Sequence, residues 1–120
     1  MEHYRQGDVC LRAVTGLPAG LVQERRDAHG RIVLAHGERT GHAHAIRNPA
    51  VDGFRFQTSE HDVNAGLFDF ILVGGAGATL KHELISGAKA EHGSVKVPPG
   101  AYEVLQQTEY TPAELVRVSD

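Results

Sequence analysis

Short runs of β-branched and apolar residues, separated at close intervals by Gly, Pro, Asn and Asp, most constrain the fold of this chain. Such punctuation is typical of β-sandwiches and β-barrels. We expect strands over residues 8–15, 21–26, 31–36, 42–47, 53–57, 67–73, 78–84, 94–97 and 101–110. The sequence therefore predicts an all-β fold, a small β-barrel or sandwich with at most one or two short helical turns.

Turn residues refine this expectation. Asp27-Ala28-His29-Gly30 predicts a hairpin turn between the runs 21–26 and 31–36, with Gly30 able to adopt a positive φ. Residues 67–73 are nearly all apolar, which indicates a central strand buried on both faces. Near the end of the chain, residues 111–114 (Thr-Pro-Ala-Glu) have the types and spacing of a capped helical turn.

Length and charge limit the classes of protein to consider. A chain of 120 residues is long enough for one domain with a core, so we expect a single β domain over residues 1–120. The net charge is -3 and no Lys/Arg run extends beyond Arg25-Arg26, which argues against nucleic acids and anionic membranes as partners. The first eight residues lack the apolar segment of a signal peptide, and no apolar run reaches the ~20 residues of a membrane span.

The single cysteine, Cys10, excludes an intramolecular disulfide and favours a reducing, cytoplasmic location. Because it lies within Val9-Cys10-Leu11, we expect it to be a small core residue. The serines lack the strand–turn–helix context of a nucleophile, so the sequence predicts no catalytic residue.

The main functional indication is His42-Ala43-His44, in a chain with eight histidines. Alternate residues of a β-strand point to the same face, so His42 and His44 lie side by side on the face that also carries Ile46. Adjacent imidazoles can bind one transition metal at about 2.0–2.1 Å each. If Ile46 points into the core, both imidazoles do so as well, and we expect them to border a pocket.

Other histidines can join this pair. His82 alternates with Leu80 and Leu84, and His92 directly precedes a predicted strand. His36 alternates with Ile32 and Leu34 and is therefore a further candidate for an inward position, whereas His3, His29 and His61 are expected to be solvated. An inward histidine is by itself more often a hydrogen-bonded core residue than a metal ligand.

Convergence of several histidines favours a metal site with His42, His44, His82 and His92 as its ligands. Imidazole ligands favour Zn, Ni, Cu or Fe as the bound divalent metal. Carboxylates able to complete or orient the site are Glu38, Glu83, Glu91 and Glu103. Four protein ligands are typical of a structural metal and three of a catalytic one, and the sequence leaves both open.

Two stretches resemble the motifs of the cupin superfamily. Gly37 followed by His42-Ala43-His44 is similar to the first motif, with one residue fewer between the Gly and the first His. Gly93 to Glu103, with Pro98-Pro99-Gly100, looks like a shortened second motif in which Glu103 occupies the place of the last metal-binding His. The resemblance implies a β-barrel with His42 and His44 inside.

A second resemblance spans nearly the full length. It rests on Arg5-Gln6-Gly7-Asp8-Val9, the spacing Gly-Glu-x-Thr-Gly-His-x-His over residues 37–44, Leu80-x-His82, Pro98-Pro99-Gly100-x-Tyr102-x-Val104 and Gln107-x-Glu109-Tyr110-x-Pro112. These resemble a group of small uncharacterised bacterial and phage-encoded proteins. The resemblance implies a stand-alone domain and names no reaction.

Two functions remain open from the sequence. The first is a metal-binding β-barrel protein that uses the His-x-His pair, with no assigned reaction and with room for a small-molecule ligand. The second is a non-enzymatic, self-associating module of a phage-derived or multiprotein assembly, with structural histidines. The second follows from strand edges that need covering, often by a partner subunit, and we expect a homo-oligomer in either case.

Overall fold

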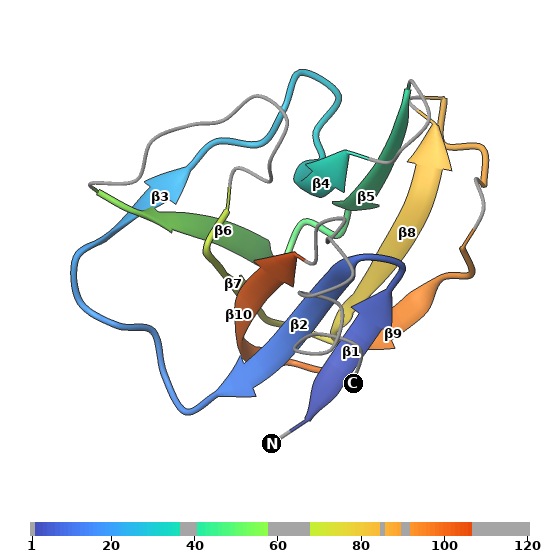
Figure 1. Cartoon of the computed structure of the whole chain (residues 1–120). Coiled ribbons are helices and arrows are strands. Elements are labelled where there is room, and N and C mark those ends of the chain that lie inside the picture. The colour runs from blue at the N-terminus through green and yellow to red at the C-terminus, as the bar shows by residue number, and fades with distance from the viewer. Residues whose placement is uncertain (1, 37–40, 58–67, 85, 90–91, 107–120) are drawn as a thin grey trace, which may run out of the picture.

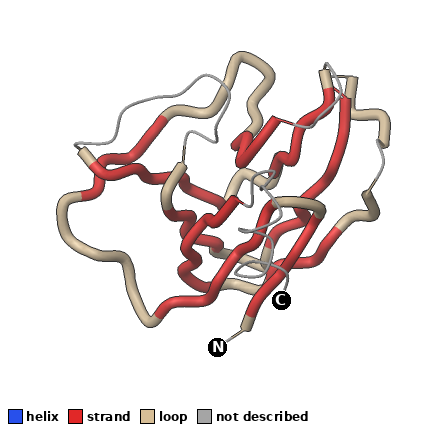
Figure 2. The backbone as a smooth tube through the Cα atoms, in the orientation of Figure 1, coloured by secondary structure: helices blue, strands red, loops and turns tan. Residues whose placement is uncertain are grey.

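The computed structural model describes residues 2–36, 41–57, 68–84, 86–89 and 92–106, which form two antiparallel sheets and no helix (Figure 1). The six-stranded sheet has the order β1 (His3–Gln6), β2 (Val9–Val14), β10 (Gly100–Gln106), β7 (Phe70–Val73), β6 (Val51–Phe56) and β3 (Leu21–Glu24). The four-stranded sheet has the order β4 (Ile32–His36), β5 (His42–Ile46), β8 (Ala78–Leu84) and β9 (Val95–Val97). The two sheets form the layers of a small β-sandwich (Figure 2).

The core lies between the two sheets because each strand turns alternate residues inward. The six-stranded sheet contributes fully buried side chains such as Leu11 and Ile71. The four-stranded sheet contributes Ile46 and Leu80, which are cross-strand partners and both 0% exposed. The inward position expected for the face of Ile46 is therefore confirmed, and with it the face on which His44 lies.

The turn at residues 27–30 is confirmed, but the hairpin built on it is wrong. The amide of Gly30 donates to the carbonyl of Asp27, and Gly30 has a φ of 74°. The strands on either side do not pair with each other, since β3 pairs with β6 and β4 pairs with β5. The turn therefore connects the two sheets. Which strands pair with each other depends on contacts between residues far apart in the sequence, and turn residues alone do not specify it.

His36, a candidate for an inward position, points outward instead. A bulge between Val33 and Ala35 shifts the register of β4 against β5, so that Ala35 lies opposite His44 and His36 opposite Ala43. One inserted residue moves every later side chain to the other face of a strand. His36 is consequently exposed on the outer face of the four-stranded sheet.

The all-β prediction is confirmed in its sandwich form, whereas the described strands do not close into a barrel. Of the central strand expected at residues 67–73, Phe70–Val73 form β7, which lies inside the six-stranded sheet. The expected burial on both faces is wrong, because Leu72 on the outer face is 40% exposed. Cys10 is a buried free thiol, as expected. The helical turn predicted at residues 111–114 lies outside the described residues. No helix in the described part of the chain has the length and apolarity of a membrane span.

Candidate functional site

The centre of the candidate site is a pair of stacked imidazoles on the inner face of the β5–β8 pair. His44 lies directly opposite His82 in the register of the two antiparallel strands. Residues opposite each other in such a pair point to the same face. Their ring centroids are 4.4 Å apart with an interplanar angle of 12°, and the side chains are 5% and 4% exposed. The site thus continues the apolar face of Ile46 and Leu80 toward the end of the strands.

His42 and His92 extend the pair into a cluster. The ring of His42, also on β5, lies 5.5 Å from that of His82 in an edge-on arrangement. His92, in the segment that leads into β9, lies 4.9 Å from His82 and 5.9 Å from His44. We call these four residues the histidine cluster. Exposure rises from buried His44 and His82 through half-buried His42 to exposed His92, so the cluster opens to solvent at the His92 end.

The four histidines chosen from the sequence are therefore brought together by the fold. Their rings stack or tilt against one another, with no common point at which their nitrogens meet. Within the described ranges, no group of three or more His, Cys, Asp or Glu side chains has the geometry to hold a metal ion. Metal ligation by the cluster stays a prediction that requires the rings to rotate.

Burial keeps His44 uncharged at neutral pH. The pKa of His44 is lowered from 6.5 to about 4, first by burial and then by the neighbouring charges of His82 and His92. A neutral imidazole with an available lone pair is the form that binds a metal. His44 is therefore in the ligating protonation state throughout the physiological pH range.

Two residues of the site were not identified from the sequence. Gln6, at the end of β1, is 3% exposed, and its side-chain oxygen lies 2.9 Å from Nδ1 of His44. Gly7, in the β1–β2 turn, has a φ of 57° and lies beneath the rings, because a Cβ there would be 2.8 Å from Nε2 of His92 and 3.1 Å from Cε1 of His44. The only sequence signal was the Gln6-Gly7 pair inside the second resemblance, which carried no chemical role.

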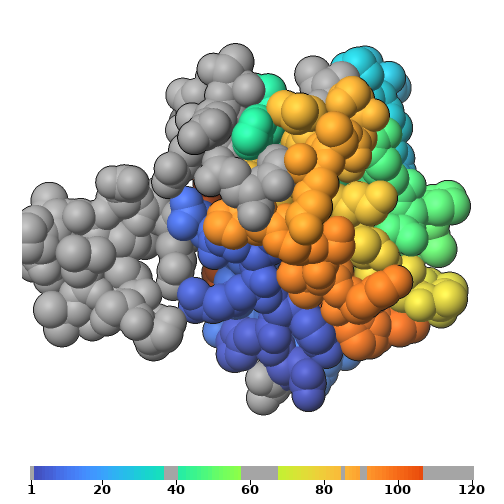
Figure 3. All heavy atoms as spheres, turned by 90° about the vertical axis from the view of Figure 1, so that its right-hand side faces the viewer, coloured from blue at the N-terminus to red at the C-terminus, as the bar shows by residue number. Residues whose placement is uncertain are grey.

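The approach of β1 to the histidine cluster explains how Gln6 and Gly7 reach it. Strand β1 is an edge strand of the six-stranded sheet and contacts β8 and β9 of the other sheet. In Figure 3 the N-terminal residues, in dark blue, lie beside the orange residues of the β9 region. The cluster therefore lies where the two sheets meet along one edge of the sandwich.

The carboxylates proposed to complete the site have other roles where the structure describes them. Glu103 lies on β10, on the face opposite buried Tyr102, and pairs with Arg12. Glu83 lies on the outer face of β8, where Nε of Arg47 donates to it at 2.7 Å and Nη1 of Arg31 lies 3.8 Å away. The two remaining carboxylates, Glu38 and Glu91, lie outside the described residues, and so does His61, which was expected to be solvated.

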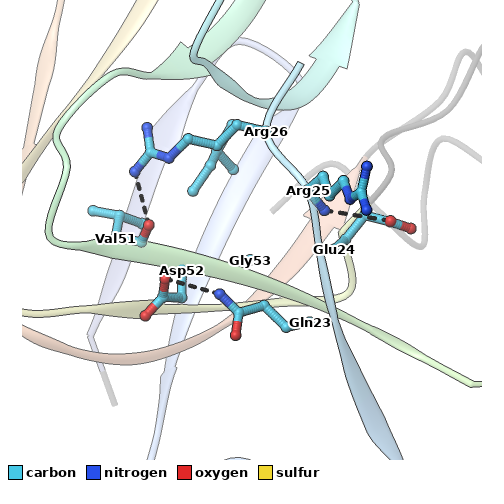
Figure 4. A pocket seen from close by; sticks show the side chains of 8 residues that line it. Gln23, Glu24, Arg25, Arg26, Val51, Asp52 and Gly53 are labelled. Atoms are coloured by element: carbon cyan, nitrogen blue, oxygen red, sulfur yellow. Dashed lines mark hydrogen bonds between the residues drawn. The ribbon is translucent and has the colours of Figure 1, made fainter. Parts of the chain in front are cut away.

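Two cavities bear on the expected pocket. A hollow of about 110 Å³ borders His82 and is also lined by Glu83, Gly87, Ser94 and two lysines, Lys81 and Lys89. A larger cavity of about 450 Å³ lies away from the histidine cluster, along β3 and β6 (Figure 4). Its polar groups already bond to one another, since Gln23 donates to Asp52 and Arg26 to the carbonyl of Val51.

Comparison with known families places the chain in one of them. Residues 5–107 match the family described as a domain of unknown function, DUF8820. The chain belongs to this family. No curated protein and no solved structure matches it. Membership in DUF8820 agrees with the expected small uncharacterised family, while the cupin resemblance is not confirmed.

Proposed function

We propose that this DUF8820 chain binds a divalent transition metal of the Zn, Ni, Cu or Fe class through its histidine cluster. The observation that carries the proposal is the gathering of four imidazoles from β5, β8 and the segment before β9, with ring centroids 4.4–5.9 Å apart along the chain of neighbours. Imidazole nitrogen is a borderline donor that suits these metals better than Mg or Ca. The proposal assigns no reaction.

The stacked imidazoles can form a metal-bound arrangement if some of the rings rotate. Two of the rings, those of His42 and His92, are not fully buried, so they can turn about their side-chain bonds without opening the core. His44 supplies a neutral, buried ligand around which they can gather. Solvent access at His92 gives the ion an entry path, which a metal site requires.

The test is metal binding by protein purified without an affinity tag and stripped with a chelator. We expect one Zn²⁺, Ni²⁺ or Cu²⁺ per chain in a competition titration, and a fall in affinity of more than about 100-fold in His44→Ala, beyond the loss typical of an outer-shell partner. His92→Ala serves as a second variant, because an exposed residue is removed without disturbing the core.

The matched control is His29→Ala, an exposed turn histidine outside the cluster, which should bind as the unmodified protein does. Circular dichroism establishes that each variant is folded. Absence of stoichiometric binding, with a Tm that chelator leaves unchanged, would overturn the proposal.

The alternative is that the imidazoles are structural, in a module that works by self-association. It is favoured by the hydrogen bond that one ring nitrogen of each buried histidine makes, since Nδ1 of His44 bonds to Gln6 and Nδ1 of His82 accepts from the amide of His92 at 3.1 Å. This alternative predicts identical stability with and without metal, and a concentration-dependent mass in sedimentation analysis that the histidine variants do not alter.

A further inference from the structure

Gln6 is fixed by three hydrogen-bond partners that come from different parts of the fold. Its side-chain nitrogen donates to the carbonyl of Leu80 at 3.0 Å and to that of Gly93 at 2.8 Å. Leu80 belongs to β8, and Gly93 directly follows His92. Gln6 therefore joins β1 of one sheet to the strand that carries His82 and to the segment that carries His92.

These two carbonyls determine which way the amide of Gln6 points. Carbonyl oxygens only accept hydrogen bonds, so the nitrogen must face them and the oxygen must face Nδ1 of His44. An amide oxygen also only accepts, so the bond at 2.9 Å requires the hydrogen to be on Nδ1 of His44. The lone pair of the neutral ring is then on Nε2.

The stacked partner ring is fixed in the opposite way. The amide of His92 donates to Nδ1 of His82 at 3.1 Å, so that nitrogen carries the lone pair. In its neutral form His82 therefore has its hydrogen on Nε2. His44 presents Nε2 as a ligand without any change, whereas His82 must first give up a hydrogen bond.

We propose that Gln6 is the positioning residue of the histidine cluster and sets His44 to bind the transition metal through Nε2. This inference rests on the proposed function. Outer-shell acceptors at the second nitrogen of a ligating histidine fix its tautomer and orientation, and their loss typically lowers metal affinity about 10–100-fold. The same side chain holds the segment after His92, so it also positions the solvent-exposed member of the cluster.

The first measurement is the tautomeric state of the histidines in the metal-free protein, by ¹⁵N-correlated NMR of the imidazole rings. We expect His44 as the Nδ1–H tautomer and His82 as the Nε2–H tautomer, with His44 becoming a mixture in Gln6→Met. A His44 ring protonated on Nε2 in the unmodified protein would overturn the inference. This readout needs no metal, so it is independent of the proposed function.

The second measurement is Zn²⁺ affinity of Gln6→Met against Gln23→Met. Gln23 is a strand glutamine whose side chain donates to Asp52 away from the histidines, so it controls for loss of a strand amide. We expect about 10–100-fold weaker binding for Gln6→Met and no change for Gln23→Met. Equal affinities would remove Gln6 from a positioning role even if the metal binds. Failure of the unmodified protein to bind any metal would overturn the proposed function and this role together. The assignment of the tautomers would still hold, because it is measured without metal.

Discussion

The two faces of the β5–β8 pair both bury polar side chains, but they compensate them differently. On the outer face, the carboxylate of Glu83 is 1% exposed and is balanced by the guanidinium groups of Arg47 and Arg31. Arg31 also pairs with Asp27 at 3.0 Å, so this outer cluster is an ion-pair network of two carboxylates and two guanidinium groups. On the inner face, burial lowers the pKa of His44, and the charges of the neighbouring His82 and His92 lower it further. The inner cluster gathers four groups of one kind, and under the proposed function an added cation would stabilise it.

The largest effect on stability should come from removing the charge of Glu83, which pairs with Arg31 and Arg47 on the outer face. Glu83→Gln keeps the shape of the side chain but leaves buried Arg31 without part of its compensation. Removing one partner of a buried ion pair typically costs about 3–5 kcal/mol. Because Arg31 keeps its contact with Asp27 at 3.0 Å, we expect a loss at the lower end of this range in the free energy of unfolding in urea. Metal affinity should be unchanged, because Glu83 lies on the face opposite His82.

Glu103→Gln is the control for this prediction. Its pair with Arg12 is partly exposed, with side chains 26% and 47% accessible, so its loss should cost less than about 1 kcal/mol. Similar losses in the two variants would show that Glu83 is not held as a buried charge, and the contrast between the two faces would disappear.

The inner cluster should produce a smaller effect that depends on pH. The pKa of His44 is about 4 in the folded chain and 6.5 in the unfolded chain, so the unfolded state takes up the proton first as pH falls. In metal-free protein the stability due to this shift is complete above pH 6.5, decreases between pH 6.5 and 4, and amounts to no more than about 3 kcal/mol.

Urea unfolding of the unmodified protein and of His44→Gln over this pH range measures the effect. The two curves should approach each other as pH falls toward 4. Asp27 contributes in a different window: burial raises its pKa, but hydrogen bonds from Arg31 and His29 outweigh this and place it below its usual 3.8. Its contribution is therefore lost only below pH 3.8. Parallel curves between pH 6.5 and 4 would contradict the burial of a neutral His44.

The local parts of this arrangement could be predicted from the sequence, because strand alternation is a local rule. The spacing of His42, His44 and Ile46 gave their shared face, and the alternation of Leu80 and His82 gave theirs. The register that sets His44 opposite His82 is not encoded in either strand alone. It follows from the pairing of β5 with β8, which are separated by β6 and β7 in the sequence.

The residues that were missed, Gln6 and Gly7, lie at the end of β1 and in the turn after it, and β1 was not among the strands expected from the sequence. The buried end of this strand carries Gln6 in place of an apolar residue, so the usual alternation signal is absent there. Its partners at Leu80 and Gly93 are 74 and 87 residues away, and no local pattern reports such contacts. A buried polar side chain that joins two sheets becomes visible only once the fold is known.

The prediction with the smallest effect tests whether His92, the exposed member of the histidine cluster, takes part in metal binding. Gly7→Ala and Gly20→Ala both place a side chain at a positive φ, of 57° and 84°, which costs about 1–2 kcal/mol in either case. They differ in surroundings, since nothing lies within 4 Å of a Cβ at Gly20, whereas one at Gly7 would lie 2.8 Å from Nε2 of His92 and 3.1 Å from Cε1 of buried His44. The exposed ring of His92 can turn away at little cost, but the buried ring of His44 must also shift slightly, so we expect Gly7→Ala to be the less stable variant of the two.

Their Zn²⁺ affinities should differ, because Gly7→Ala displaces His92 from His44 while Gly20→Ala leaves the cluster intact. We expect at least about tenfold weaker binding in Gly7→Ala alone, comparable to loss of an outer-shell partner. Because the backbone cost is shared, the difference in affinity reports the displacement of the imidazoles of His92 and His44. Equal affinities would exclude His92 as a ligand and restrict the site to the three histidines of β5 and β8.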